Sequence, residues 1–289
     1  GAIAGVTLGG QAQFHPRLYV LALTDRFVEE GGTIVEEARV TGVDAGADEC
    51  TVETESGACF AGQVVLATHY PLLDRGVFFA RLQVERSYVI AMSVADDSPL
   101  VPAGMLYAAE QPSRSLRTAP LGGGRTLVLV GGAGHHTGRA KTGHRYAELK
   151  DWALGIDTGA LVHSRWSAQD PTASDGLPYA GPVSFGRGRI WTVTGLRKWG
   201  MTNGTAAAHV IASRIGGERH AWESAFGSLS SELRRGVTSL VRENATIGAR
   251  FAGDRIASRL RPRNADSLAP GEGAIVRHDG QTAAGYRDP

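Results

Sequence analysis

The chain has 289 residues, of which 42% are hydrophobic and 20% are charged, and its formal net charge is +1. This composition is typical of a globular protein, and the near-neutral charge argues against nucleic acid or an anionic membrane as the main partner. No apolar run approaches the roughly 18 residues of a membrane span, no signal peptide is visible, and two cysteines are too few for a disulfide framework, which favours a cytoplasmic location.

The first 76 residues predict a helix followed by strands. Apolar side chains recur at helical spacing over residues 16–30, with a proline in the first turn and Gly31-Gly32 after the end. Residues 33–45 alternate as a strand does, residues 50–60 indicate a hairpin, and residues 63–71 (QVVLATHYP) indicate a buried strand. This order predicts α/β organisation.

The two cysteines flank the predicted hairpin. With the turn at Ser56-Gly57, Thr54 is expected opposite Cys59, and Cys50 about two pairs farther along. This offset argues against a disulfide between them.

His15 directly precedes the proline that opens the first predicted helix. An imidazole at this positive helix end is disfavoured as a cation and could contact an anionic group instead. From the residues alone, a capping or packing histidine is the favoured interpretation.

From about Val77 the pattern changes to short strands separated by Pro and Gly turns, which predicts a mostly antiparallel sheet. The stretch HRYAELKDWAL, residues 144–154, predicts a helix within this region. The predicted strands cover residues 82–94, 104–110, 114–120, 126–132 and 161–169.

After Pro171 the α/β character returns. A β-branched run over residues 190–194 meets Gly195, a second glycine follows at Gly200, and an Ala-rich helix is predicted from about Thr202 to Ile215. Residues 195–203 are therefore predicted to form a loop between a parallel strand and a helix, an arrangement that often holds a phosphate or an anionic ring. Residues 218–261 are predicted to be helical, and residues 262–289 form a polar linker and the start of another unit.

A second glycine-rich stretch follows the strand at residues 126–132. Its spacing from Gly132 to Gly138 is G-x-G-x-x-x-G, and about eight residues separate it from the next helix, unlike a Rossmann motif. The favoured interpretation is an inter-element loop; a loop near a substrate and a dinucleotide site remain alternatives.

The histidines give no metal-binding set. His135 and His136 are adjacent and should point apart in a strand, no H-x-x-x-H occurs, and no Cys-His pair has ligand spacing. His163, Ser164 and Asp170 share one segment without a G-x-S-x-G elbow, which argues against a hydrolase triad. No metal ligand and no catalytic residue is identified.

Four stretches occur together in an order that resembles the FAD-dependent oxidoreductases of the D-amino-acid oxidase and glycine oxidase superfamily, most closely the branch with a C-terminal Rieske iron–sulfur domain. The two specific stretches are QAQFHP and KWGMTNGTAAA, and the resemblance covers nearly the whole chain. The remaining stretches are GGTIVEEARVTGVDA with the following block to VVLATHYP, and WSAQDPTASDGLPYAGP.

The resemblance implies which residues hold FAD. The late glycine loop would close over the flavin ring, and the N-terminus of its helix would face the pyrimidine edge. Val40 would meet the adenine through its backbone, and Ala67 and Thr68 would end a strand beside the cofactor. The ring edge would be held by backbone groups of Gly195, Lys198, Gly200, Met201 and Thr202.

The resemblance also implies that the chain is an internal fragment. The partner glycine motif would belong to a strand–turn–helix before Gly1, and a Rieske domain would begin near the C-terminus. A Rieske 2Fe-2S cluster needs two Cys and two His, and no cysteine follows Cys59, so the cluster is expected only in the full-length protein.

The predicted fold class is α/β (α+β): an FAD/NAD(P)-binding-like domain with an inserted, mostly antiparallel substrate domain and a helical C-terminal segment. The boundaries are 1–76 and 171–217 for the FAD domain, 77–170 for the substrate domain, 218–261 for the helical segment and 262–289 for the linker and truncated Rieske-like start.

Three hypotheses follow for function. The first is hydride transfer from a small amine- or alcohol-type substrate to flavin. In the full-length protein this hypothesis includes transfer of electrons from the flavin to a Rieske cluster, and the final electron acceptor is unknown. The alternatives are a non-catalytic fragment without flavin, and a nicotinamide-binding protein that uses Gly131 to Gly138. Weak candidates for substrate contact in the second domain are Arg86, Tyr88, His135 and His136.

Overall fold

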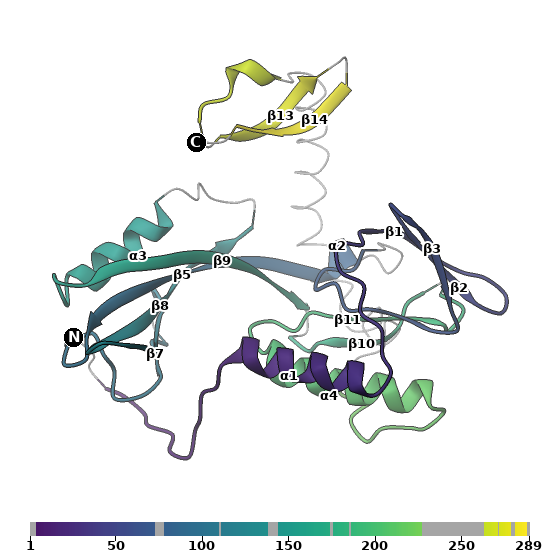
Figure 1. The fold of residues 1–289 in the computed structure, drawn as a ribbon, viewed down its shortest axis with the longest axis horizontal. Helices are drawn as coiled ribbons and strands as arrows, with labels where there is room; N and C mark the ends of the chain where they lie inside the picture. The colour runs from purple at the N-terminus through teal and green to yellow at the C-terminus, as the bar shows by residue number, and fades with distance from the viewer. Residues whose placement is uncertain are drawn as a thin grey trace.

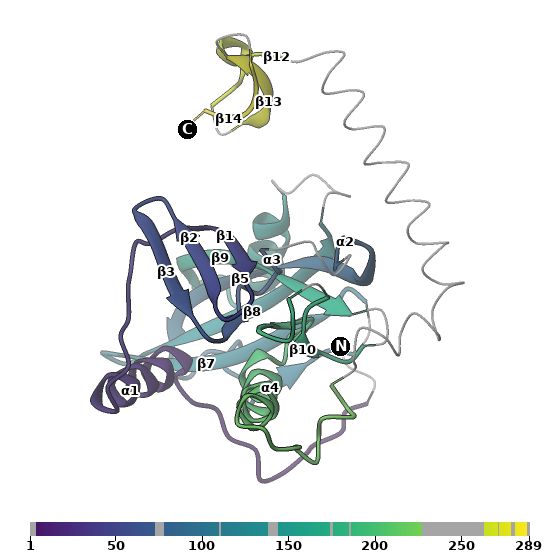
Figure 2. The same cartoon turned by 90° about the vertical axis from the view of Figure 1, so that its right-hand side faces the viewer.

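The computed structural model describes residues 4–72, 78–109, 111–137, 144–173, 176–184, 186–226, 263–270, 272–278 and 281–287. Within them, every helix is too short or too polar to span a bilayer. Figures 1 and 2 show the arrangement of the elements from two perpendicular directions.

The largest element is a five-stranded antiparallel sheet with the order β6-β7-β8-β5-β9. Four of its strands are longer than the sequence pattern predicted, and the largest extensions are in β8, which runs for 12 residues, and in β9, which runs for 13. The strands are β5 (Leu82–Ala95), β6 (Leu106–Tyr107), β7 (Arg114–Gly122), β8 (Arg125–His136) and β9 (Leu161–Ala173).

Helix α3 (Arg145–Leu154) covers one face of this sheet (Figure 1), as the spacing of its apolar residues predicted. Leu149 and Ala153, four residues apart, are fully buried on that side, where they pack against Ile90 of β5 and Val128 of β8. Burying such aliphatic side chains contributes roughly 1.5–3 kcal/mol each.

A second sheet has the order β10-β11-β4, with β11 parallel to β4 and antiparallel to β10. Helix α4 (Gly200–Ile215) packs on it through Ala207, Val210 and Ile211, with Ala207 and Ile211 beside Trp191. The strand bounds are β4 (Val64–Leu66), β10 (Tyr179–Pro182) and β11 (Ile190–Thr194). The prediction of a strand followed by a helix after residue 190 is confirmed.

The predicted buried strand over residues 63–71 is only partly correct. It is three residues long, and although Leu66 is 4% exposed, Val65 is 43% exposed. A short strand at the edge of its sheet leaves part of its apolar surface open to solvent.

The third sheet, β1-β2-β3, contains the predicted hairpin, with bounds β1 (Val40–Ala45), β2 (Cys50–Thr54) and β3 (Gly57–Ala61). Residues 33–39 form no strand, so the predicted strand over 33–45 is too long. The expected pairing of Thr54 with Cys59 is wrong, because the turn is tighter and Thr54 pairs with Gly57. Cys59 pairs with Val52 instead, and both cysteines are free thiols, Cys50 buried and Cys59 exposed.

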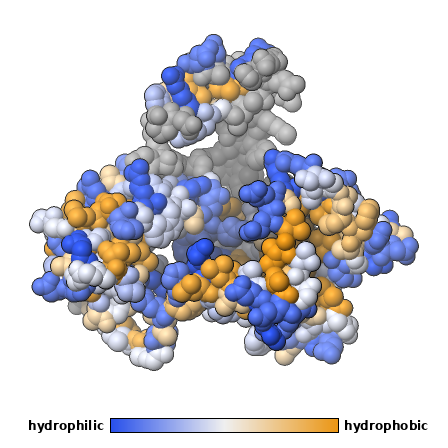
Figure 3. Space-filling view, in the orientation of Figure 1, coloured by the Kyte–Doolittle hydropathy of each residue, from blue (hydrophilic) through white to orange (hydrophobic). Residues whose placement is uncertain are grey.

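Helix α1 (Pro16–Glu29) begins at His15, which acts as its N-cap. The Leu18 N–H donates to His15 Nδ1 at 3.3 Å, which confirms the capping interpretation. None of the 14 residues of α1 is buried, and Leu18, Phe27 and Val28 are all more than half exposed. Figure 3 shows apolar side chains on the surface of the molecule that faces the viewer of Figure 1.

The C-terminal part differs from its prediction where it can be compared. Residues 218–226 form turns rather than a helix, and the rest of the predicted helical segment, 227–261, lies outside the described residues. A small sheet follows, β12 (Arg263–Asn264), β13 (Gly273–His278) and β14 (Gln281–Tyr286), with a short 3-10 helix, η2 (Ala265–Ser267). The remaining short helix is α2 (Phe78–Arg81).

Asp157, in the turn between α3 and β9, carries the one resolved pKa shift in the described structure. The Ser98 hydroxyl, and then the Gly159 N–H at 2.8 Å, donate to this carboxylate and lower its pKa from the usual 3.8. A carboxyl whose pKa is depressed by folding stabilises the protein above its unfolded pKa, and this contribution is lost as the pH falls through the folded pKa.

We therefore expect Ser98→Ala to destabilise the protein more at about pH 6, above the usual pKa of 3.8, than at a pH low enough to protonate the Asp157 carboxylate in the folded protein. Urea unfolding of both proteins at a series of pH values measures the difference. In an Asp157→Asn background the effect of Ser98→Ala should not depend on pH; a dependence that persists there would contradict the assignment.

Candidate functional site

The turn between β11 and α4 has a conformation that glycine adopts most readily. Gly195 has φ +70°, and the Arg197 N–H donates to Pro171 O at 3.0 Å, which ties the turn to β9. The helix begins at Gly200, so the loop covers residues 195–199 and is four residues shorter than predicted. Gly200, Met201 and Thr202 belong to the first helical turn.

The N-terminus of α4 is open. Within the described residues, Trp199 at the N-cap makes no side-chain capping hydrogen bond, and a Cβ built on Gly200 would meet no atom within 4 Å. The first N–H groups of a helix have no intrahelical acceptor and lie at the positive end of its dipole. The start of α4 can therefore accept an anionic or electron-rich group.

A cavity of about 590 Å³ lies beside this helix start, and we call it the α4 cavity. It joins three parts of the chain: the segment that leads into α1, strands β7 and β8, and Met201. Gln13 Nε2 donates to Thr118 O at 3.1 Å and fixes the segment to the sheet. The cavity brings together residues of both QAQFHP and KWGMTNG; it is lined by Ala12, Gln13, Phe14, His15, Pro16, Arg117, Thr118, Ala119, Pro120, Leu129 and Met201.

Lys198 connects the loop to the antiparallel sheet through its side chain. Its Nζ donates to Asp170 Oδ2 at 2.6 Å and to Ser87 Oγ at 3.2 Å, and Ser87 Oγ donates to the same carboxylate oxygen at 3.2 Å. These bonds join the loop before α4 to β9 and β5. The ammonium charge of Lys198 is thereby compensated by a carboxylate that is 17% exposed.

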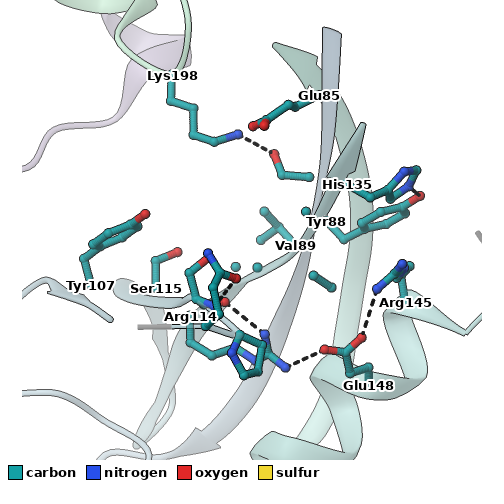
Figure 4. Close-up of a pocket in the computed structure, with 18 of the residues that line it drawn as sticks. Glu85, Tyr88, Val89, Tyr107, Arg114, Ser115, His135, Arg145, Glu148 and Lys198 are labelled. Atoms are coloured by element: carbon teal, nitrogen blue, oxygen red, sulfur yellow. Dashed lines mark hydrogen bonds and ion pairs between the residues drawn. The ribbon is translucent and has the colours of Figure 1, made fainter. Parts of the chain in front are cut away.

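Lys198 also lines a second cavity of about 510 Å³, which we call the sheet-edge cavity. Figure 4 shows Lys198 extending toward Glu85 on one side, with Tyr107 and Arg114 around the opening and Glu148 below. The cavity thus lies between the loop of residues 195–199 and the antiparallel sheet.

Three of the four weak candidates for substrate contact meet at the sheet-edge cavity, namely Tyr88, His135 and His136. Tyr88 OH lies 3.0 Å from His135 Nε2, and His135 Nδ1 lies 2.9 Å from His136 O. Because a carbonyl oxygen only accepts, the neutral His135 carries its proton on Nδ1, and Tyr88 donates to Nε2. Both histidines line this cavity, and the expectation that their side chains point apart stays a prediction; an irregularity in the β5–β8 register between Arg86 and Tyr88 lies beside them.

Arg86, the fourth candidate, is not among the residues that line either cavity. Its Nη1 donates to Ser167 Oγ at 2.7 Å on the neighbouring strand β9. This contact favours a role in holding the two strands together.

A buried ion cluster forms one wall of the sheet-edge cavity. Arg114 Nη2 lies 2.7 Å from Glu148 Oε1, and Arg145 Nη1 lies 3.5 Å from Glu148 Oε2. The side chain of Arg114 is 9% exposed, and Gly132 leaves room for it because a Cβ there would come within 3.2 Å of Arg114. One carboxylate therefore bridges two guanidinium groups, which leaves the cluster with a net charge of +1, and its contact with Arg114 fastens α3 to β7.

Glu148→Gln should lower the free energy of unfolding by about 2–4 kcal/mol, because it leaves a buried guanidinium without its carboxylate. Urea unfolding measures the change. The matched control is Glu55→Gln, which removes the exposed Arg39–Glu55 pair, 79% and 61% exposed, and should cost less than about 1 kcal/mol. Equal effects of the two substitutions would contradict the structural role of the cluster.

The other residues assigned to FAD lie apart from the α4 cavity. Val40 packs against the core cluster that contains Leu66, at the start of β1. Ala67 follows β4 and lines an apolar cavity of about 440 Å³ together with Val193 and Gly204. Thr68 donates from Oγ1 to Tyr70 O at 2.8 Å. Their roles toward the cofactor stay predictions.

The nicotinamide alternative is contradicted by the sheet. Gly131, Gly132 and Gly134 lie within β8, which pairs antiparallel with both neighbours, and not in a turn between a parallel strand and a helix. Gly138 lies outside the described residues. A strand interior cannot aim successive N–H groups at a pyrophosphate, as the glycine-rich turn of a Rossmann unit does.

The hydrolase alternative gains no support either. Asp170 is engaged by Lys198 and Ser87, and not by His163 or Ser164, with which it shares β9. Among the described residues, no three His, Cys, Asp or Glu side chains gather closely enough to hold a metal ion.

Several residues of the site escaped the sequence interpretation, namely Arg114, Glu148, Arg145, Asp170 and Arg117. Two of their contacts join residues far apart in the sequence, because Lys198 and Asp170 are 28 residues apart and Arg114 and Glu148 are 34 residues apart. The sequence signal was weak: each is one charged residue in an otherwise ordinary strand or helix. Only the strand order decides which of them meet.

Comparison with known proteins identifies the family. The profile of the family described as FAD dependent oxidoreductase (DAO) matches residues 1–214, which include every residue assigned to FAD above. Among curated proteins, the chain is 30% identical over 295 residues to a Bacillus subtilis (strain 168) protein named as the Rieske 2Fe-2S iron-sulfur protein YhfW. The match covers 100% of this chain and 56% of that protein, so the chain spans about half the length of this relative.

Solved structures share the fold. Glycine oxidase from Geobacillus kaustophilus superposes with a TM-score of 0.54 at 20% identity, over 70% of this chain and 54% of that one. L-proline dehydrogenase from P. horikoshii superposes with a TM-score of 0.60 at 17% identity, over 76% and 60% of the two chains. Because the family profile matches well over half of its residues, the chain belongs to the FAD dependent oxidoreductase (DAO) family.

Proposed function

We propose that this chain is the flavin and substrate part of an FAD-dependent oxidoreductase that oxidises a small amine- or alcohol-type molecule. The observation that carries the proposal is the α4 cavity, where the open helix start meets the QAQFHP segment and the antiparallel sheet. Two stretches nearly 190 residues apart in sequence, roughly residues 12–16 and 201, line one cavity whose other walls are mostly apolar. Such a cavity fits a planar, apolar ring with one electron-rich edge.

The residues present fit a flavin in this place. Backbone N–H groups of Gly200, Met201 and Thr202 would meet the pyrimidine edge of the ring, and Gly200 leaves the approach open. When bound, FAD supplies the acceptor for the hydride of the substrate, and the protein binds, orients and polarises. Gly195 would hold the loop in place, and Lys198 would fasten it to β9 and β5.

The sheet-edge cavity is the proposed place for the substrate. Tyr88 and His135 form a hydrogen-bonded pair there, and Glu85 and Lys198 lie at its rim (Figure 4). Both cavities adjoin the same loop, because Lys198 lines one and Met201 the other. A ligand in the second cavity would therefore lie close to the loop that is proposed to hold the flavin.

Electron transfer to a Rieske 2Fe-2S cluster is proposed only for the full-length protein. The proposal is supported by the name of the Bacillus subtilis relative and by the resemblance of the C-terminal hairpin, β13–β14. A small-molecule substrate, no nucleic-acid partner and a cytoplasmic location are proposed from composition and the cysteine count.

The test is the visible spectrum of the purified full-length protein, followed by anaerobic mixing with a panel of small amines and alcohols. Flavin absorbance that is bleached by at least one class of compound supports the proposal. A colourless protein that gains no flavin after reconstitution with FAD would favour the non-catalytic alternative.

A further inference from the structure

The α4 cavity has an unequal distribution of charge. Among the described residues that line it, Arg117 alone carries a full charge, and no carboxylate is present. Arg117 lies on β7, where it pairs with Leu129 of β8, and it is exposed. The described structure gives it no ion-pair partner.

Arg117 differs from Lys198 in having no carboxylate that compensates its charge among the described residues. Both cations lie near the start of α4, but the ammonium of Lys198 is compensated by Asp170 at 2.6 Å. A salt-bridged pair has a much smaller field at a distance than a single charge, because the two charges oppose each other. Among the residues that line the α4 cavity, Arg117 is therefore the cation whose field no paired carboxylate opposes.

Two uncharged groups around the cavity add to the positive electrostatic potential inside it. His15 Nδ1 accepts from the Leu18 N–H, so the neutral ring keeps its proton on Nε2 and presents a donor. The N-terminus of α4 contributes the positive end of its dipole. The cavity thus favours a group that carries or acquires negative charge.

We propose that Arg117 supplies the positive charge that stabilises negative charge on the reduced flavin. The inference rests on the proposed function, and adds a residue of the antiparallel sheet to the determinants of the reduction potential. A cation near the ring favours the reduced form over the oxidised form and so raises the potential.

The experiment measures the two-electron midpoint potential of the full-length flavoprotein and of Arg117→Met and Arg117→Lys. For a single partly exposed charge we expect Arg117→Met to weaken the reduced form about tenfold relative to the oxidised form. This corresponds to a potential lower by about 30 mV for a two-electron couple. Arg117→Lys should keep most of the wild-type value, because it keeps the charge.

A second readout is the affinity for sulfite, which adds to oxidised flavin and leaves negative charge on the ring. It should fall by a similar factor of about ten in Arg117→Met. The matched control is Arg39→Met, an arginine that is 79% exposed and paired with Glu55 on the β1 side of the molecule. This control changes the net charge equally and should change neither value.

The outcomes separate the two proposals. A full-length protein that holds no flavin would overturn the proposed function and this inference with it. A protein that holds flavin, with equal potentials for wild type and Arg117→Met, would overturn only the inference. Acetate is the third probe: if Arg117→Met weakens acetate binding while the potential and sulfite affinity stay unchanged, Arg117 serves an anionic ligand and the proposal is wrong.

Discussion

Residues 1–289 on their own are expected to bind FAD roughly a thousandfold more weakly than a longer protein that also carries a glycine motif for the pyrophosphate. The one glycine-rich stretch that could have served lies within the antiparallel strand β8. Each charge-assisted hydrogen bond to a phosphate is worth roughly 1.5–3 kcal/mol, so the loss of two or three accounts for this factor. The contacts that remain would be those of the start of α4 with the ring edge and of Val40 with the adenine.

Titration of the 289-residue chain with FAD, followed by flavin fluorescence, measures this affinity. Apoprotein of the full length, reconstituted in the same buffer, is the control. Tight and stoichiometric quenching by a monomer of the short chain would contradict the expectation, and would mean that the residues around the α4 cavity bind the dinucleotide without a glycine motif.

The surface of the short chain gives a second readout in the same experiment. β4 is the edge of its sheet, Val65 is 43% exposed, and α1 buries none of its residues. An unpaired strand edge beside exposed apolar side chains favours association between chains. Light scattering should therefore increase with concentration for the short chain.

The sequence predicted best those elements in which apolar residues recur with a clear helical or strand period over a short stretch. The helices α1 and α3 and the strand β11 follow from apolar spacing and from the glycines or prolines at their ends. The start of α4 was placed two residues too late, because Gly200 and Met201 look like loop residues. Helix starts are poorly defined by sequence when no Ser, Thr, Asp or Asn caps them.

The glycine-rich end of β8 shows why a glycine count misleads. Gly132 has φ +150°, and a Cβ there would lie 2.5 Å from Ser113 O and 3.2 Å from Arg114. The glycine therefore makes space for a buried side chain on the neighbouring strand and opens no phosphate-binding turn. Nothing in the local sequence distinguishes these two uses.

The candidate site was predictable in its loop and not in its side-chain partners. The loop conformation itself is observed, whereas the assignment of Gly195, Lys198, Gly200, Met201 and Thr202 to the flavin stays a prediction; Tyr88 and His135 were named as weak candidates for substrate contact. That Tyr88 and His135 meet depends on the register of β5 on β8, and that Lys198 meets Asp170 depends on β9 lying at the edge of the same sheet. Strand register and strand order depend on tertiary packing and cannot be predicted from the local pattern of a single sequence.

Valine at residue 195 is expected mainly to lower the stability of the fold, whereas valine at residue 200 is expected mainly to lower flavin binding. Gly195 has φ +70°, and a Cβ there would lie 3.3 Å from Ala173 Cβ and 3.5 Å from Leu82 Cδ2. A β-branched residue is strained in this conformation, and its methyl groups would press on two buried side chains, so Gly195→Val should cost about 2–4 kcal/mol of unfolding free energy. Gly200→Val should cost much less, because its Cβ meets nothing and its φ is not positive.

The order reverses for the cofactor. In the full-length protein, Gly200→Val should reduce the bound flavin per polypeptide, because a side chain at the start of α4 blocks the close approach of a ring to the backbone N–H groups. Urea unfolding and the ratio of flavin to protein absorbance, measured on both variants, separate the two effects, and Gly200→Ala gives the smallest possible obstruction as a control. Wild-type flavin content in Gly200→Val would mean that the ring does not lie at the start of α4. An equal loss of stability in the two valine variants would mean that the fold itself requires glycine at residue 200, and that the space before the helix is not open.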